Sequence, residues 1–321
     1  MLIPRLDIDA AAARIRPHLA PTPLLRSEEF SRRLGANVYF KLETLQPTHS
    51  FKVRGAFSAL TRLTAEQRKL GVVTASGGNH GLAVAYAAAK LGIPASVYLP
   101  ASATEAKLAV IRRLGPEVVI HGKAWDDANA LAIEIARKSA RAYIHPFDNA
   151  NVMAGQATLV TEILQHLEPD LIVASIGGGG LISGILSAVR HFSPSTRVFG
   201  VETEGADSMY RSRKAGRIVE LPAITSIAET LGARKTEKFQ FEIVCEHVAD
   251  LVTVTDESAI RALLELLELE KLLAEPAASC SVAALLEGKI PFESGDDVVV
   301  VLCGANIGMD KVRSWQTAAA T

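Results

Sequence analysis

Lys52 is the first residue in the sequence whose surroundings suggest chemistry. It stands within residues 48–56, THSFKVRGA, between Phe51 and Val53. An amine removed from water has a lowered pKa and can act as a nucleophile or form a Schiff base. A lone lysine is more often a solvated helix residue, so Lys52 by itself leaves both interpretations open.

Two further segments offer backbone N–H groups to an anion. Residues 177–180 are four glycines between a short apolar run and a helical run. Glycines at a helix start let the backbone approach a phosphate, which the helix dipole also favours. Residues 75–81, ASGGNHG, have a similar position, and there Ser76 and Asn79 can add hydrogen bonds to a carboxylate. The simpler interpretations are a tight turn without a ligand and a helix N-cap.

A dinucleotide site competes for the glycine segment. Gly178 and Gly180 begin a G-x-G-x-x-G pattern whose third position is Ser183. Glu202 ends the next expected strand about 20 residues later, where a ribose would be bound. This pattern would suit an NAD-dependent dehydrogenase, but it leaves the other two segments unexplained.

The elements that must position these segments alternate along nearly the whole chain. Short apolar runs predict strands at residues 71–74, 95–99, 118–120, 142–144, 171–176, 197–201, 251–254 and 297–302. Alanine-rich stretches predict helices that include residues 80–91, 126–139, 155–167 and 256–271. This alternation is typical of parallel sheets with helical crossovers, so we expect an α/β enzyme.

Composition and charge exclude several classes of protein. The chain has 321 residues, 49% of them hydrophobic and 21% charged. At about 150 residues per domain this length predicts roughly two domains with buried cores, not a disordered or fibrous chain. A formal charge of −1 gives no reason to expect a nucleic-acid partner. Residues 171–189 carry no charge, but their glycines divide them into strand and helix, so no membrane partner is expected.

The cysteines and the first residues bear on the compartment. Cys245, Cys280 and Cys303 form no disulfide or zinc pattern, which fits a reducing environment. The opening residues mix charged with apolar side chains instead of forming a secretory signal. We therefore expect a cytoplasmic protein.

Taken together, the motifs resemble those of the fold-type II pyridoxal-phosphate enzymes. They lie at residues 50–56 (SFKVRGA), 76–81 (SGGNHG), 147–148 (FD), 155–156 (GQ), 177–181 (GGGGL) and 302–306 (LCGAN). The resemblance implies a tryptophan synthase β-like α/β fold with two open, twisted, mostly parallel sheets flanked by helices. It also implies a large cofactor-binding domain, residues 1–48 and 147–321, with a small domain, residues 49–146, inserted in it.

The resemblance implies a role for each motif. Lys52 would hold the cofactor, pyridoxal 5'-phosphate, and remove the Cα proton of the substrate. The other expected cofactor contacts are Phe51, Asn79, Gly177, Gly178, Gly179, Gly180, Leu181 and Cys303. The expected contacts of the substrate carboxylate are Ser76, Gly77, Asn79 and His80. A thiol, with a reference pKa of about 8.5, is a weak donor to the ring nitrogen, which favours β-elimination over transamination.

Within that superfamily the chain is most similar to the serine/threonine dehydratases, or ammonia-lyases. Residues 221–233 and 272–279 resemble serine dehydratase in particular. The resemblance implies a homodimer that converts the small amino acids L-threonine or L-serine into a 2-oxo acid and ammonia. His49 is a departure, because these enzymes usually have glycine there.

A relative that acts on another β-hydroxy amino acid, or that racemises serine, is the alternative within the family. The related racemases have a serine directly after the position of Ser76, where this chain has Gly77. We therefore predict little racemase activity.

A cation site is the last feature that the resemblance implies. Glu202, Ala206 and Ser208 match positions that hold a cation in the relatives, together with carbonyls near Leu231 and Ala233. Members that bind a divalent metal have an aspartate at the position of Ser208. Fewer carboxylates suit a monovalent cation such as potassium better.

Overall fold

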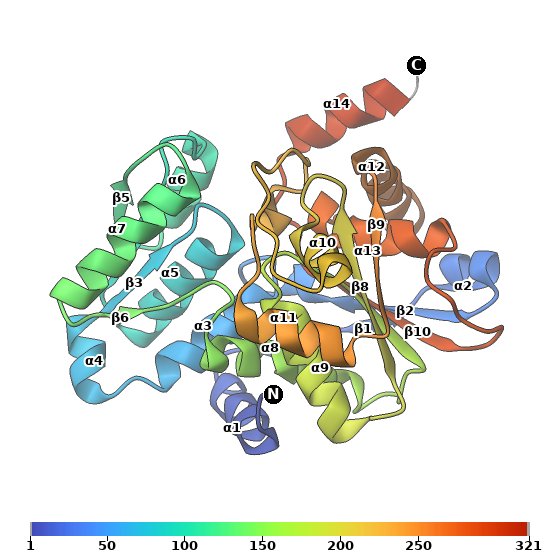
Figure 1. Cartoon of the computed structure of the whole chain (residues 1–321), viewed down its shortest axis with the longest axis horizontal. Coiled ribbons are helices and arrows are strands. Elements are labelled where there is room, and N and C mark those ends of the chain that lie inside the picture. Colours follow the sequence, from blue (N-terminus) through green and yellow to red (C-terminus); the bar gives the residue numbers. More distant parts are fainter. Residues whose placement is uncertain (1, 320–321) are drawn as a thin grey trace.

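Two sheets, each covered by helices, build the molecule (Figure 1). The structure, a computed structural model, describes residues 2–319. The larger sheet has the strand order β1-β2-β10-β7-β8-β9, and the smaller has the order β5-β4-β3-β6. All neighbouring strands are parallel except β1, which runs antiparallel to β2. The expected fold class is confirmed.

The strands of the larger sheet are β1 Leu24–Arg26, β2 Asn37–Leu42, β7 Leu171–Ser175, β8 Arg197–Thr203, β9 Asp250–Val254 and β10 Asp297–Leu302. Those of the smaller sheet are β3 Val72–Ala75, β4 Ala95–Leu99, β5 Glu117–Ile120 and β6 Ala142–Tyr143. The smaller sheet thus lies within the segment expected to form the small domain, on one side of the molecule in Figure 1. The domain boundaries themselves stay a prediction.

The helices of the first half are α1 Arg5–Ile15, α2 Glu28–Leu34, α3 Lys52–Thr61, α4 Ala65–Leu70, α5 Asn79–Leu91, α6 Glu105–Arg112, α7 Trp125–Lys138 and α8 Ala150–Ile163. Those of the second half are α9 Gly180–Phe192, α10 Ser208–Ala215, α11 Lys238–His247, α12 Asp256–Glu265, α13 Pro276–Leu286 and α14 Met309–Ala319. Short 3₁₀ turns occupy Glu43–Leu45 and Glu229–Leu231, and a π-helical turn occupies Leu266–Glu270.

Burial on both faces explains the sequences of the central strands. In β10 the run from Val298 to Leu302 is fully buried, and so is all of β7. Helices α9 and α13 both pack on strands of the larger sheet. A parallel strand covered on both sides is continuously apolar instead of alternating, which is why these strands were detectable in the sequence.

Helix ends and edge strands differ most from expectation. The helix expected at residues 155–167 begins at Ala150, because the Asn149 side chain accepts hydrogen bonds from the N–H groups of Asn151 and Val152. The helix expected to reach Lys271 leaves α-geometry after Glu265. Strand β1, at the edge of the larger sheet, and its neighbour β2 were not expected at all.

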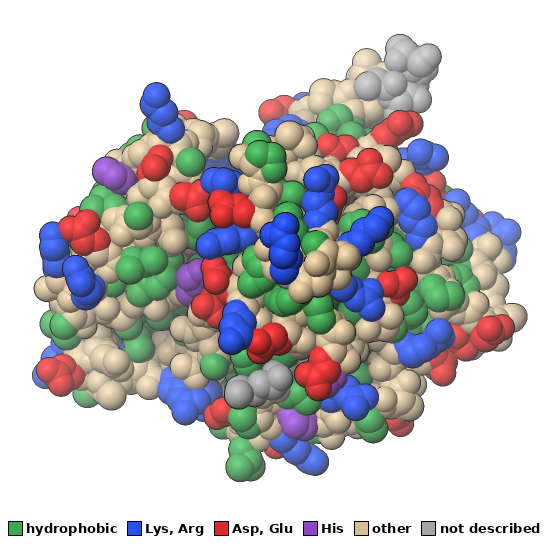
Figure 2. Space-filling view, viewed as in Figure 1, with side chains coloured by type: hydrophobic (Ala, Val, Ile, Leu, Met, Phe, Trp, Pro, Cys, Tyr) green, Lys and Arg blue, Asp and Glu red, His purple; other side chains and the backbone are tan. Residues whose placement is uncertain are grey.

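The surface shows no strong segregation of charge on the face seen in Figure 2, where basic and acidic side chains are interspersed. Within residues 2–319, no helix is both long enough and apolar enough to cross a membrane.

Candidate active site

Two adjacent pockets lie at the ends of strands from both sheets. The open pocket, about 530 Å³ in volume, takes its lining from segments as distant as Gly77 after β3, Val110 in α6 and Asn306 after β10. A smaller inner pocket lies beside it at the end of β7. Asn79, Thr230, Glu275 and Ala277 line both. The carboxyl ends of parallel strands therefore frame one continuous site, as expected for an open α/β sheet.

The inner pocket brings together every residue expected to contact the cofactor. These are Phe51, Lys52, Asn79, Gly177, Gly178, Gly179, Gly180, Leu181 and Cys303. They come from four distant parts of the chain, so the fold, and not the sequence spacing, makes them neighbours.

Lys52 is the first residue of α3, and its side chain points into the inner pocket. Its Nζ donates a hydrogen bond of 2.9 Å to the carbonyl oxygen of Pro146. Burial lowers the pKa of Lys52 to about 8, although Cys303 and Glu275 nearby oppose the shift. The amine is therefore far closer to neutral at physiological pH than an ordinary lysine.

The glycine turn, residues 177–180, leads from β7 into α9. A Cβ at Gly178 would lie 2.3 Å from the Phe147 ring, so only glycine fits against it. Gly179 has a φ of 94°, a left-handed conformation that other residues avoid. The N-terminus of α9 receives no side-chain cap from the described residues. Its N–H groups can therefore bind an anion such as a phosphate.

Cys303 follows β10, and its Sγ lies 3.4 Å from Ser175 Oγ. Burial raises the pKa of the Cys303 thiol to about 12. The thiol thus stays neutral at physiological pH, as the expected weak donor or acceptor would.

The loop after β3 holds the residues expected to bind the substrate carboxylate. Gly77 and Asn79 line the open pocket, whereas Ser76 and His80 lie beside the pockets without lining them. The His80 ring is buried, with its Nε2 3.0 Å from the Ile144 carbonyl oxygen, and burial lowers its pKa to about 3. Any contact of His80 with a carboxylate would therefore come from its backbone N–H.

Glu275 is a site residue that sequence analysis missed. Its carboxylate accepts hydrogen bonds from Asn79 Nδ2 at 2.8 Å, Thr230 Oγ1 at 2.7 Å and the backbone N–H of Asn306 at 3.0 Å. Asn306 Nδ2 in turn donates to Asn79 Oδ1 at 2.7 Å. This arrangement fixes the orientation of the Asn79 amide. Its segment, residues 272–279, was part of the resemblance to serine dehydratase, but a glutamate before Pro276 is equally typical of an ordinary helix start, so no role was assigned to it.

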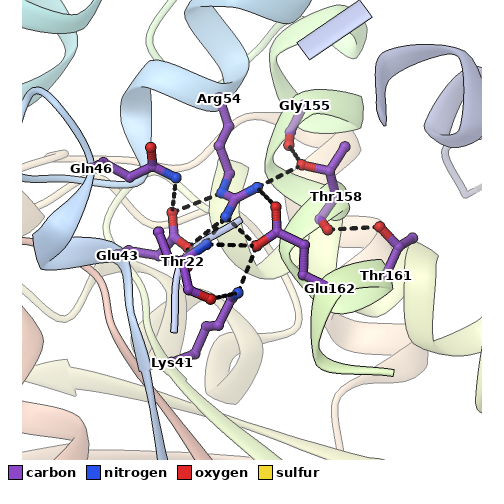
Figure 3. A network of polar contacts seen from close by, with 9 residues as sticks. All are labelled: Thr22, Lys41, Glu43, Gln46, Arg54, Gly155, Thr158, Thr161 and Glu162. Atoms are coloured by element: carbon purple, nitrogen blue, oxygen red, sulfur yellow. Dashed lines mark hydrogen bonds and ion pairs between the residues drawn. The ribbon is translucent and has the colours of Figure 1, made fainter. Parts of the chain in front are cut away.

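A buried ionic network anchors the helix that carries Lys52 (Figure 3). Arg54 donates to both oxygens of Glu43 at 2.7 and 2.8 Å and to both oxygens of Glu162 at 2.6 and 2.7 Å. Lys41 adds a bond of 2.6 Å to Glu162. Burial disfavours the charged guanidinium, but the two carboxylates outweigh it and raise the pKa of Arg54. The network joins α3 to β2, to the turn after it and to α8.

The expected cation positions are close together but already hydrogen-bonded. Glu202 is 1% exposed, and its carboxylate accepts from the backbone N–H groups of Met209 at 3.1 Å and Tyr210 at 2.6 Å. Ser208 Oγ donates to the Ala233 carbonyl at 3.0 Å. Burial raises the pKa of Glu202 to about 8.

Two other cation positions, Ala206 and Leu231, are buried, and Leu231 also lines the inner pocket. Within the described part of the chain, no group of three or more His, Cys, Asp or Glu residues could hold a metal ion. The bonds of Glu202 to α10 also argue against its binding a ribose, which was the basis of the dinucleotide interpretation.

A buried amine, an uncapped glycine turn and a neutral thiol around one pocket define the class: an α/β enzyme built to hold a phosphorylated cofactor on a lysine. Residues 15–304 match the family described as pyridoxal-phosphate dependent enzyme. The chain therefore belongs to that family, and pyridoxal phosphate is the cofactor that these residues fit.

Similar proteins of known name cover nearly the whole chain. An L-threonine ammonia-lyase of Geobacter sulfurreducens is 40% identical over 313 residues, which are 97% of this chain and 77% of that protein. A phenylserine dehydratase of Ralstonia pickettii is 39% identical over 307 residues, 94% of this chain and 93% of that protein. The structure of maize serine racemase has a TM-score of 0.91 and 32% identity, covering 98% of this chain and 96% of that chain.

Proposed function

We propose that this protein is an ammonia-lyase that converts L-threonine or L-serine into a 2-oxo acid and ammonia. The observation that supports this most directly is the convergence of the Lys52 amine, the glycine turn and Asn79 on one pocket. The Geobacter and Ralstonia relatives, an ammonia-lyase and a dehydratase by name, support the same class of reaction.

In this proposal the inner pocket holds the cofactor. Lys52 Nζ would bind it covalently, and the glycine turn with Leu181 would bind its phosphate. Asn79 would contact the ring hydroxyl, Phe51 would lie against the ring and Cys303 would face the ring nitrogen. When bound, the cofactor withdraws electrons from the substrate Cα and so stabilises negative charge there.

The residues of the chain supply proton transfer and orientation. Lys52 Nζ would remove the Cα proton, and its lowered pKa of about 8 keeps part of the amine neutral at pH 7, as a general base requires. The loop of residues 76–80 would bind the substrate carboxylate with the N–H groups at the start of α5. Cys303, with a neutral thiol, would not hold a facing nitrogen protonated as a carboxylate would.

Ammonia release from L-threonine tests the proposal. Lys52→Ala should lower kcat at least about a hundredfold, because it removes both the cofactor attachment and the base. Lys138→Ala, which alters an exposed lysine of α7, is the matched control and should retain wild-type activity. Equal activity of the wild type and Lys52→Ala would contradict the assignment of Lys52.

We also propose that the positions around Glu202 bind a monovalent cation such as potassium. The supporting geometry lies at the start of α10, where Glu202 accepts from the N–H groups of Met209 and Tyr210 and Ser208 Oγ donates to the Ala233 carbonyl. Burial disfavours an uncompensated charge on Glu202 and raises its pKa to about 8, which a bound cation would offset. Activity should therefore rise when potassium replaces sodium, and Glu202→Gln should abolish the difference. Equal activity in both salts for the wild type would count against a cation.

The assembly and location of the protein are proposed on the resemblance. We propose a cytoplasmic homodimer in which residues 49–146 form the small domain. The three cysteines, all free in the structure, support a reducing compartment. Light scattering of the purified protein should give twice the mass of the chain, and the mass of a single chain would contradict the dimer.

A further inference from the structure

The open pocket is large for the side chain of threonine or serine. Its volume is about 530 Å³, within the range of pockets that enclose much larger ligands. Gly77 and Asn79, from the loop assigned to the substrate carboxylate, lie on its wall, and it shares Thr230 and Glu275 with the inner pocket. A substrate held at this junction would direct its β-substituent into the open pocket.

The wall of the open pocket is mainly apolar. Its large side chains are Leu82, Val110, Ile111, Ile227, Ile307 and Trp315. Val110, on α6, remains 42% exposed although it is a large hydrophobic residue. A methyl group would cover little of this surface, whereas an aromatic ring would remove much of it from water.

Both lysines at the open pocket already have a carboxylate partner. Lys107 and Lys311 both pair with Glu229, with N···O distances of 2.5 and 2.7 Å. The pairs join α6, on the side of the smaller sheet, to the 3₁₀ turn at Glu229 and to α14. Because both lysines have a partner carboxylate, a second carboxylate on the substrate would have to compete with Glu229.

We propose, on the basis of the ammonia-lyase function proposed above, that the preferred substrate is a β-hydroxy amino acid with a large apolar β-substituent, such as 3-phenylserine. In that reaction the Cα–H and Cβ–O bonds break and water leaves. Water then returns as the C–N bond is hydrolysed. The net products from phenylserine are phenylpyruvate and ammonia, with no oxidant or reductant required.

The first test compares substrates on the cofactor-loaded enzyme. Ammonia release is measured with L-threonine, L-serine, L-threo-3-phenylserine and L-threo-3-hydroxyaspartate. We expect kcat/KM to be at least about tenfold higher for phenylserine than for threonine. A higher value for threonine, serine or hydroxyaspartate overturns the substrate inference and leaves the ammonia-lyase proposal standing. Ammonia from none of the four overturns both.

The second test changes the wall. Val110→Asp places a charge in the apolar surface and should lower kcat/KM for phenylserine about tenfold more than for threonine. Ile133→Asp is the matched control, because Ile133 is 45% exposed on α7 and does not line the open pocket. Thermal unfolding of both variants checks that the fold is retained. An unchanged preference in Val110→Asp would overturn the role of this wall.

Discussion

At Lys52, burial and two neighbouring groups shift the pKa of the amine in opposite directions. Desolvation disfavours the ammonium form, whereas Cys303 and Glu275 favour it, and the pKa settles at about 8. The neutral fraction therefore increases as the pH rises through 8, while an ordinary lysine, with a pKa of about 10.4, is still charged there.

This difference predicts the pH dependence of cofactor binding. Only the neutral amine attacks an aldehyde, so the rate at which the cofactor-free protein binds pyridoxal phosphate should rise about tenfold between pH 7 and pH 9. Stopped-flow absorbance measures this rate, with Nα-acetyl-lysine, whose side-chain amine is free, in the same buffers as the reference for an ordinary lysine. If the rate for the protein follows the same pH profile as the rate for Nα-acetyl-lysine, the pKa of Lys52 is not lowered.

Gly77 leads to a prediction about stereochemistry. A racemase needs a second acid or base on the opposite face of Cα, and Gly77 has no side chain to supply one. A Cβ there would lie 3.2 Å from Leu99 Cδ2, so the backbone is also packed closely. Incubation with L-serine should give no measurable D-serine by chiral chromatography. Formation of D-serine at a rate comparable to ammonia release would refute this.

At the scale of the elements, one polar network joins α3 to its neighbours. Arg54 lies two residues after Lys52 and connects α3 to Glu43 after β2 and to Glu162 on α8. Glu43 and Arg54 are fully buried, and removing one partner of such a pair leaves an uncompensated charge in the interior. The network thus fixes the first turn of α3, from which Lys52 points into the inner pocket.

Arg54→Gln should lower the free energy of unfolding by about 3–5 kcal/mol. Urea denaturation measures it, and Arg62→Gln is the control. Arg62, at the other end of α3, makes an exposed pair with Asp7 that contributes at most about 1 kcal/mol. Burial raises the pKa of Glu43 and Arg54 lowers it, so in Arg54→Gln the pKa of Glu43 should be higher than in the wild type. The loss of stability should therefore shrink as the pH falls and Glu43 becomes protonated. Equal losses for the two variants would contradict the account of the network.

At the scale of the whole molecule, the sequence predicted those features that a short segment of the chain determines by itself. The central strands were predictable because β7 and β10 are continuously apolar. The residues that line the inner pocket could be selected because each belongs to a short local motif. What could not be predicted depends on contacts between distant segments. Glu275 is 196 residues from Asn79, and Glu162 is 108 residues from Arg54. Neither a hydrophobic periodicity nor a short motif indicates which distant residues will form such a pair.

The open pocket is a second feature that the sequence could not predict. Its apolar wall combines Leu82, Val110, Ile227 and Ile307, and each of these looks like an ordinary core or surface residue in its own segment. Only the arrangement of the two sheets makes them one surface. For this reason the reaction class could be inferred from the sequence, whereas the proposal of a large substrate side chain depends on the structure.

We propose that Lys52 holds the cofactor in an enzyme that releases ammonia from β-hydroxy amino acids. The most direct measurement is the visible absorbance spectrum of the purified protein, loaded with pyridoxal phosphate, before and after addition of L-threonine. We expect a visible band that changes with the amino acid, together with equal amounts of 2-oxobutanoate and ammonia, and neither in Lys52→Ala. Absence of the band from the wild type after the cofactor is supplied would contradict it.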